Sequence, residues 1–429
     1  MSGSDQLQAK RKKNFERELA NSKNIPVDEK MFIDWILKTL KIQVRYNSIL
    51  QRQEFNAGAG WQTWTDEQDL LWHRVRSEFE HKDFQNEKLI SQAITKEAYR
   101  NKVNPIKEYL ASCPHDWTTW ALDNTLLIDG LPPSPGLLIA EYIDSPMDKK
   151  TIAEIFNSWL VGCAMHGHDP ENNDWAGSTI CPILTGPQGC NKSRFTAWIG
   201  QAAGREYYNE SIIDADNKDN RIALATTWIW AADEFSGTMI KSKNETIKNF
   251  LSRKSITERL PFGKRPQTMP RVASLIGTDN EPRPLRDTTG NRRFAVIPIT
   301  RVRLEEMQAV LPLDRLWGGA MWLWKNQKHT PTISRDAQKA INDENENAVE
   351  RGAWAEILLE KLKFDENGEC TSSDIFQSIL GVCPADFTDE KSRKLGQILN
   401  SIQFESLGVK QAWRKHNKKS VRVWIGCKI

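Results

Sequence analysis

The chain has 429 residues, of which 39% are hydrophobic and 27% charged, and its formal net charge is +3. This length predicts two or three domains, and the small net charge means that any affinity for nucleic acid must come from local basic clusters. No apolar run approaches the roughly 20 residues that span a bilayer, and the basic start is followed by no apolar segment, so we expect no membrane partner and a cytoplasmic location.

The pattern of apolar residues divides the chain into five stretches. Residues 1–103 repeat apolar positions every three or four residues, as in "MFIDWILKTLKI", and are predicted to be an N-terminal helical region. Residues 104–150 contain the proline-rich "DGLPPSPG" and are interpreted as a connecting segment packed on the domain that follows. Residues 151–325 alternate short apolar runs with helix-like ones, which favours a three-layer α/β/α domain. Residues 326–350 read as a helical linker, and residues 351–429 as a small C-terminal module.

The segment "ILTGPQGCNKSRF" has the spacing of a phosphate-binding P-loop between a buried strand and a helix. Asn191 stands where glycine is usual, but asparagine tolerates left-handed backbone angles and can keep the turn. A chance match in a glycine-containing loop is the alternative. The residues expected to surround a nucleotide are Gly186, Pro187, Gln188, Gly189, Cys190, Asn191, Lys192, Ser193 and Arg194.

A P-loop of this kind implies a division of labour between side chains. Lys192 is expected to reach the β- and γ-phosphates of ATP, and the Ser193 hydroxyl to ligate Mg²⁺. "ATTWIWAADEF" then supplies two acids after an apolar strand. Asp233 would hold Mg²⁺ through its water shell, and Glu234 would orient and deprotonate the attacking water. A capping pair before a helix would explain one of these acids but explains the preceding strand less well.

Two later segments complete the predicted ATPase site. "RVASLIGTDN" is a strand that ends in Asn280, which is expected to position the water or to sense the γ-phosphate. "RDTTGNRRFAVIPI" places Arg292 and Arg293 before another strand. In ring ATPases an arginine of one subunit completes the site of the next, and we favour Arg293 over Arg292 for this role. Either arginine would serve equally well in a surface ion pair.

The order of these motifs resembles the virulence-associated E family of phage and mobile-element ATPases, which is related to superfamily 3 helicases within the AAA+ class. The resemblance covers about Val103 to Pro298 and includes "VNPIKEYLAS" and "IKNFLSRKSITERLPFGKRP". It implies an AAA+ core in a bacterial host cell, acting as a hexameric ATP-driven motor on single-stranded DNA during replication. Residues 1–103 show no primase-like pair of carboxylates, so a separate primase-polymerase would supply the primers.

Basic residues are concentrated between the two acids and Asn280. In a ring, a hairpin at this place faces the central channel, where cations follow phosphates without reading sequence. The tip is expected at "LPFGKRP", and the alternative is a solvated charge run on a surface helix. Arg259 and Arg271 could instead belong to the ATP site. The residues predicted to contact DNA are Lys248, Arg253, Lys254, Arg259, Lys264, Arg265 and Arg271.

Residues 351–429 read as three helices followed by a strand pair, the order of a winged-helix module. The third helix would be offered to a DNA groove, and Lys415, Lys418 and Lys419 would contact phosphates from the wing. Docking of a partner protein or a neighbouring subunit is the alternative for this module.

Three functions fit these motifs. The first is a ring-forming DNA helicase or translocase. The second is a replication initiator or loader that is switched by ATP and prefers duplex origin DNA. The third is a defence or signalling ATPase that acts on protein partners.

Overall fold

The computed structural model describes residues 29–64, 87–174, 180–241, 244–261, 265–285, 293–348, 353–400, 404, 407–416 and 419–428. The chain forms two compact units, Met1–Ala111 and Ser112–Ile429. Within the described ranges, none of the helices combines the length and apolar character needed to cross a membrane.

The first unit is a mixed α/β structure. Its four-stranded sheet has the order β3-β2-β1-β4, in which β1 and β2 are antiparallel and β4 is parallel to β1. The prediction of a helical region is therefore wrong for residues 43–63. In β1 the buried Val44 and Tyr46 are separated by the half-buried Arg45, which is the two-residue period of a strand. The elements are α2 (Glu29–Leu40), β1 (Gln43–Asn47), β2 (Arg52–Asn56), β3 (Trp61–Thr63), α4 (Glu87–Arg100), β4 (Lys102–Val103) and α5 (Pro105–Ser112).

The second unit is built on a parallel sheet, as the α/β prediction requires. Its five strands have the order β12-β6-β11-β8-β7 in the described part of the chain. All neighbouring pairs in this sheet are parallel. The carboxyl ends of β6, β8 and β11 therefore meet at one edge. The strands are β6 (Cys181–Thr185), β7 (Tyr208–Glu210), β8 (Ile229–Ala232), β11 (Ser274–Asp279) and β12 (Phe294–Pro298).

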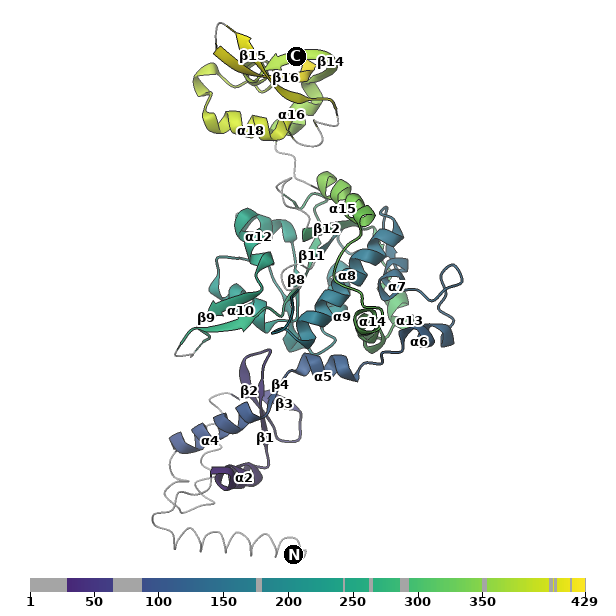
Figure 1. Cartoon of the computed structure of the whole chain (residues 1–429), viewed down its shortest axis with the longest axis vertical. Helices are drawn as coiled ribbons and strands as arrows, with labels where there is room; N and C mark the ends of the chain where they lie inside the picture. Colours follow the sequence, from purple (N-terminus) through teal and green to yellow (C-terminus); the bar gives the residue numbers. More distant parts are fainter. Residues whose placement is uncertain are drawn as a thin grey trace, which may run out of the picture. The chain divides into compact units, whose positions relative to one another are not determined.

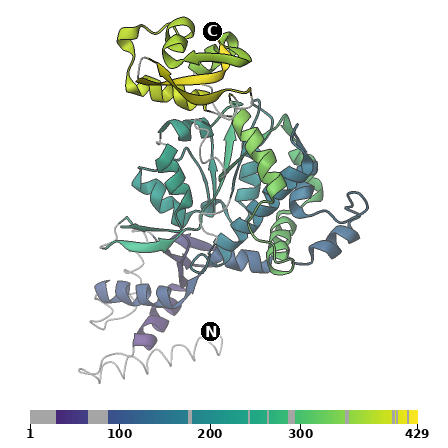
Figure 2. The ribbon, with the colours of Figure 1, turned by 45° about the horizontal axis from the view of Figure 1, so that its top comes forward.

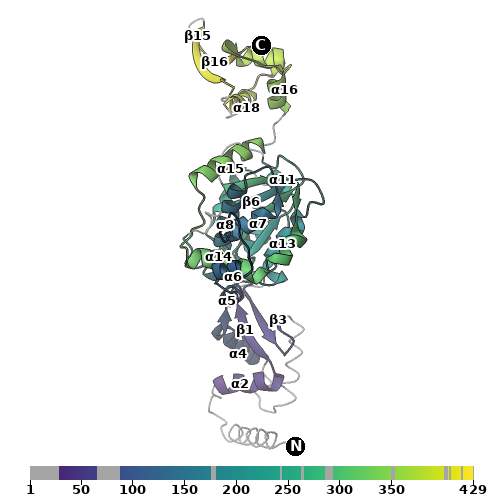
Figure 3. The same ribbon diagram turned by 90° about the vertical axis from the view of Figure 1, so that its right-hand side faces the viewer.

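Helices cover both faces of this sheet (Figures 1 and 3). On one face lie α8 (Lys149–His168) and α9 (Lys192–Gly200), which meet through the rings of Phe156 and Phe195, 5.8 Å apart. On the other face lie α11 (Phe235–Lys241) and α12 (Asn244–Ser252), whose apolar side chains join the core of β8 and β11. The interior is packed from both sides, which fixes the strand ends that carry polar residues.

The segment from Ser112, where the second unit begins, to the start of α8 packs on the domain that contains the parallel sheet. Trp117 is buried, and its indole N–H donates to the Pro133 carbonyl at 2.8 Å. The elements here and after β12 are α6 (Trp117–Asp123), α7 (Pro135–Glu141), β5 (Ile143–Asp144), β13 (Arg301–Val302), α13 (Leu304–Val310), α14 (Leu313–Lys325) and α15 (Arg335–Asn347). Strands β5 and β13 pair antiparallel.

The outer edge of β12 is closed by a side chain of α15. The buried Asn345 accepts from the Val296 amide at 3.1 Å and donates to the Phe294 carbonyl at 2.8 Å. An amide side chain thus pairs with two backbone groups of this edge strand, as a neighbouring strand would.

An antiparallel hairpin is inserted between α12 and β11, and Figure 2 shows it in teal as an arm that projects from the sheet. It consists of β9 (Ser255–Glu258) and β10 (Gln267–Pro270). Glu258 of β9 forms an ion pair with Arg221 on α10 (Lys218–Thr226), with 2.6 Å between Oε1 and Nε, and this pair ties the hairpin to the helix. Because β11 begins directly after β10, the hairpin starts from the amino edge of the parallel sheet.

Arg271, predicted to contact DNA, lies in the interior at the base of this hairpin. Only 2% of its surface is exposed, and its guanidinium donates to the carbonyls of Ala273 and Leu251. The prediction is wrong because this cation is used within the protein: it ties the hairpin base to the end of α12.

The C-terminal module contains a three-stranded sheet of order β14-β16-β15. Its core includes Phe376, Leu395 and Trp424. The predicted helices and strand pair are present, and β14 is an addition that the sequence analysis missed. The elements are α16 (Ala353–Lys361), β14 (Lys363–Thr371), α17 (Ser372–Asp374), a π-turn (Ile375–Ile379), a 3₁₀ turn (Pro384–Asp386), α18 (Asp389–Leu399), β15 (Lys410–His416) and β16 (Lys419–Lys428).

We expect Arg271→Met to destabilise the second unit by about 2–4 kcal/mol, because two buried carbonyls lose their donor. The melting temperature measured by calorimetry should fall by roughly 5–10 °C. Arg259→Met is the matched control, since Arg259 is exposed on the same hairpin and its loss should cost no more than about 0.5 kcal/mol. An Arg271→Met protein that melts like the wild type would contradict this assignment.

Candidate functional site

The loop between β6 and α9 is held against two other strand ends. The Gly186 amide donates to the Asp279 carbonyl at 3.2 Å, and the Ile299 amide donates to the Thr185 carbonyl at 2.7 Å. A Cβ atom at Gly186 would lie 2.1 Å from the Ile299 carbonyl oxygen, so only glycine fits. The loop is thus fixed at its first residue by the close approach of the backbone that follows β12.

Asn191 adopts the left-handed backbone conformation expected of it, with φ 70° and ψ 16°. Its side-chain amide donates to the Val302 carbonyl at 3.0 Å, and the Val302 amide donates in turn to the Cys190 carbonyl at 2.9 Å. Its side-chain oxygen accepts from Arg194 at 3.1 Å. Asparagine therefore keeps the glycine-like turn and adds a tether that glycine lacks.

Lys192 begins α9, and its ammonium group is enclosed by the loop that precedes it. Its Nζ donates to the carbonyls of Gly186 and Pro187, both at 2.8 Å, and to the Asn280 side-chain oxygen at 3.1 Å. Lys192 and Asn280, the residue that follows β11, are 88 positions apart in sequence, yet they are in direct contact.

The two predicted acids follow β8 at the same edge of the sheet. Asp233 is half-buried, and its carboxylate accepts from the Thr278 hydroxyl at 2.6 Å. Glu234 is exposed and has φ 48°, a left-handed conformation that costs a non-glycine residue about 1–2 kcal/mol. The strain is placed at the residue predicted to act as the base.

These parts surround one cavity of about 360 Å³. Its lining brings together the loop between β6 and α9, both acids and the end of β11. Gly186 and Pro187 are not part of the lining, but their carbonyls accept from Lys192. The lining residues are Gln188, Gly189, Cys190, Asn191, Lys192, Ser193, Arg194, Asp233, Glu234, Thr278, Asp279 and Asn280.

The chemistry of the lining fits a phosphate ester with a hard cation. A loop at a helix N-terminus, with a lysine, suits phosphate oxygens. Ser193 and Asp233 offer the few oxygen ligands that Mg²⁺ takes when it keeps most of its water. In the described part of the chain no cluster of three or more His, Cys, Asp or Glu side chains could hold a metal by itself.

Three residues of this region were missed by the sequence analysis. Thr278 and Asp279 end β11 and line the cavity. Glu210 ends β7, and burial together with the nearby Asp233 carboxylate raises its pKa. The signal for the first two was present, because polar residues at the carboxyl end of a buried parallel strand point toward the site edge.

Arg293 lies at the amino end of β12, at the sheet edge opposite the loop between β6 and α9. Its Nε donates at 2.8 Å to the hydroxyl of Ser252, the last residue of α12. It is therefore separated by the length of a strand from the cavity of its own chain. Arg292 lies outside the described residues.

Four of the basic residues predicted to contact DNA are exposed near the hairpin: Arg253, Lys254, Arg259 and Arg265. The Nζ of Lys254 donates to the Asp174 carbonyl at 3.1 Å. Lys264 and Lys418 lie outside the described residues, and the side chains of Lys248, Lys415 and Lys419 are likewise not among those described.

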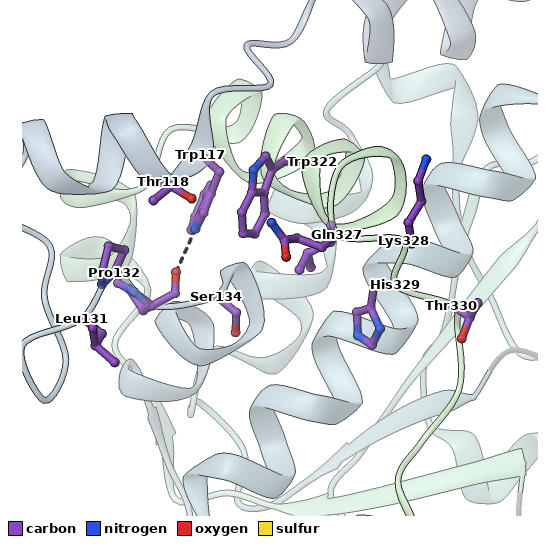
Figure 4. A pocket seen from close by; sticks show the side chains of 12 residues that line it. Trp117, Thr118, Leu131, Pro132, Ser134, Trp322, Gln327, Lys328, His329 and Thr330 are labelled. Atoms are coloured by element: carbon purple, nitrogen blue, oxygen red, sulfur yellow. Dashed lines mark hydrogen bonds between the residues drawn. The ribbon is translucent and has the colours of Figure 1, made fainter.

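A second cavity of about 610 Å³ lies between α6 and the end of α14 (Figure 4). It is lined by aromatic and polar side chains such as Trp117, Trp322 and Gln327, and none of its lining residues is acidic. Burial lowers the pKa of His329 at its rim. It is larger than the cavity next to Lys192 but contains none of the residues expected to act on a phosphate ester.

Comparison with known families gives one match within this unit. Residues 138–350 match the virulence-associated protein E-like domain. The virulence-associated protein E-like segment begins inside α7, later than the Val103 expected from the motifs, and extends beyond Pro298 through α15. The predicted resemblance is confirmed over this segment, and the link to superfamily 3 helicases stays a prediction.

The chain also aligns with solved structures. The alignment with an apo structure of the NrS-1 C terminal region covers 94% of this chain and 100% of the NrS-1 chain, with 13% identity and a TM-score of 0.47. An A form of this region gives 14% identity and a TM-score of 0.48 over 93% of this chain and 100% of that chain. The alignment with the JCV helicase covers 80% of this chain and 94% of the helicase chain, with 12% identity and a TM-score of 0.29. TM-scores below 0.5 do not establish a shared fold. No curated protein matches the chain.

We expect Asn191→Gly to keep the melting temperature within about 2 °C of the wild type, because glycine adopts the same backbone angles freely. Asn191→Val should lower it by roughly 3–6 °C, since a β-branched side chain is costly in the left-handed region. Calorimetry of the three proteins decides between two causes. Equal losses in both variants would mean that the bond to Val302 matters and the backbone angle does not.

Proposed function

We propose that this chain is an AAA+ ATPase that hydrolyses ATP with Mg²⁺ and uses the energy to move along single-stranded DNA during phage or mobile-element replication. The observation that carries the proposal is the meeting of Lys192, Asp233, Glu234 and Asn280 at one cavity, from three neighbouring parallel strands. Such a group of polar residues suits nucleotide hydrolysis, whereas a sheet edge with only a structural role has no need of it.

Each side chain then has one task. With nucleotide bound, Lys192 would exchange the carbonyls of its loop for the β- and γ-phosphate oxygens, and Ser193 and Asp233 would hold Mg²⁺. Glu234 takes a proton from the water that attacks the γ-phosphorus, the bond to the bridging oxygen breaks, and ADP and phosphate are released. Asn280 orients that water or the γ-phosphate, which its contact with Lys192 supports.

A ring of subunits, which we take to be a hexamer, explains the position of Arg293. Its distance from the P-loop of its own chain supports a role at the site of the neighbouring subunit, where it stabilises charge in the transition state. The hairpin β9–β10 leaves the same amino edge of the sheet, and its exposed cations suit a phosphate backbone in a channel.

The C-terminal module has helices followed by the strand pair β15–β16, which supports a winged-helix assignment. Its wing would bind DNA phosphates next to the motor. A separate primase-polymerase would supply primers.

Two substitutions test the nucleotide site separately. Lys192→Ala should abolish tight ATP binding and lower turnover at least about 100-fold, because phosphate charge loses its main partner. Glu234→Gln should keep the dissociation constant for a fluorescent ATP analogue while lowering phosphate release by roughly 100- to 10,000-fold. Glu206→Gln, an exposed acid outside the cavity, is the control. Normal phosphate release by either site variant would contradict the site assignment.

The hairpin is tested by removing two of its exposed cations. Arg259→Ala with Arg265→Ala should preserve ATP turnover without DNA and abolish its stimulation by single strands. The slope of log affinity against log salt concentration should become shallower by about 0.7 for each DNA phosphate that the variant no longer neutralises. Arg335→Ala with Lys339→Ala removes the same charge from exposed positions on α15. Equal effects of the two double variants would show that overall charge, and not the hairpin, binds DNA.

A further inference from the structure

Three consecutive residues at the end of β11 contact three different parts of the site. Thr278 donates to Asp233, and Asn280 accepts from Lys192. The carboxylate of Asp279, between them, accepts from two backbone amides, those of Ser236 and Glu281. The proposed function uses Asn280 but leaves Asp279 without a task.

Asp279 is 4% exposed, which is unusual for an acid and requires compensation. Its Oδ1 accepts from the Glu281 amide at 2.8 Å, and its Oδ2 accepts from the Ser236 amide at 2.5 Å. Hydrogen bonds from amides to a carboxylate are short and stronger than those between neutral groups. Ser236 lies in the first turn of α11, where the helix dipole also favours a negative charge.

The bond to Ser236 acts on the segment that carries Glu234. The Gly237 amide donates to the Glu234 carbonyl at 2.7 Å, which closes a tight turn that begins at the left-handed Glu234 and has Phe235 and Ser236 at its centre. A turn with this strain persists only when surrounding contacts hold it. The Asp279 carboxylate grips the backbone inside this turn, and it comes from a different strand.

The second oxygen of Asp279 acts on the other side of the site. By holding the Glu281 amide, it fixes the chain immediately after Asn280. One buried carboxylate therefore sets the relative placement of the residue proposed as the base and the residue proposed to orient water or phosphate. Both must be placed to within fractions of an ångström for proton transfer in the transition state.

We propose that Asp279 is a positioning residue for ATP hydrolysis, which holds Glu234 in the orientation that deprotonates the attacking water. This role rests on the proposed function, because it requires Glu234 to be the base. Both carboxylate oxygens of Asp279 are engaged by backbone amides, although the residue lines the cavity. Its removal should therefore slow the chemical step and leave nucleotide affinity in place.

The test is a double-mutant cycle in the full-length protein, with Asp279→Asn and Glu234→Gln alone and together. Asp279→Asn keeps the size of the side chain but turns one acceptor into a donor that faces an amide N–H. We expect it to lower kcat roughly 10- to 100-fold, with the dissociation constant of a fluorescent ATP analogue within about twofold of the wild type. In the Glu234→Gln background it should change the residual turnover by less than about twofold, because the group that it positions is already gone.

Thr278→Val is the matched control from the adjacent position. It removes the hydroxyl that donates to Asp233, so it should raise the Mg²⁺ concentration needed for half-maximal turnover, whereas Asp279→Asn should leave that concentration unchanged. Asp279→Ser, which keeps one small acceptor, provides a second reading if Asp279→Asn melts far below the wild type. It too should lower kcat without changing the dissociation constant of the fluorescent ATP analogue.

The outcomes separate the two claims. Full additivity of Asp279→Asn and Glu234→Gln, or a rise in the nucleotide dissociation constant equal to the fall in kcat, would overturn the positioning role while the ATPase assignment stands. No hydrolysis by the wild type under any nucleic-acid condition would overturn the proposed function and, with it, the role of Asp279.

Discussion

The site depends on the contact between Lys192 and Asn280, which joins the loop after β6 to the end of β11. This contact exists because the two strands are adjacent and parallel, so their carboxyl ends meet at one edge. The neighbouring β8 brings Asp233 to the same edge, where Thr278 binds it. Two apolar layers pack this sheet from both faces and keep the three strand ends in register, so the geometry of the polar groups follows from the core.

The opposite edge of the sheet carries a second set of linked parts. Arg293 donates to Ser252 at the end of α12, and the buried Arg271 donates to the adjacent Leu251 carbonyl. The end of α12 thus contacts both the proposed trans-acting arginine and the base of the hairpin that is proposed to bind DNA. Residues at the two edges are connected through short strands, which are stiff elements. In our account, this connection lets an event at the nucleotide act on the hairpin.

The sequence indicated which polar residues meet at the cavity more completely than it indicated the surrounding structure. The spacing of Gly186, Gly189 and Lys192 is local, so it could be recognised directly, and the left-handed Asn191 followed from its intrinsic backbone preference. Arg271 was assigned to DNA because a count of charges does not distinguish an exposed guanidinium from one that caps buried carbonyls. The strands of residues 43–63 are short and rich in polar residues, although they pair with their neighbours in sequence. Residues 363–371 pair with β16, a distant segment that no local pattern reveals.

We propose that the protein hydrolyses ATP in this cavity in response to single-stranded DNA. The most direct measurement is steady-state phosphate release by the purified full-length protein with no nucleic acid, with single-stranded DNA and with duplex DNA, each with and without Mg²⁺. The account predicts Mg²⁺-dependent hydrolysis that single strands stimulate strongly and duplex stimulates less. Hydrolysis that is indifferent to DNA would contradict the motor assignment, and the absence of hydrolysis in every condition would contradict the ATPase itself.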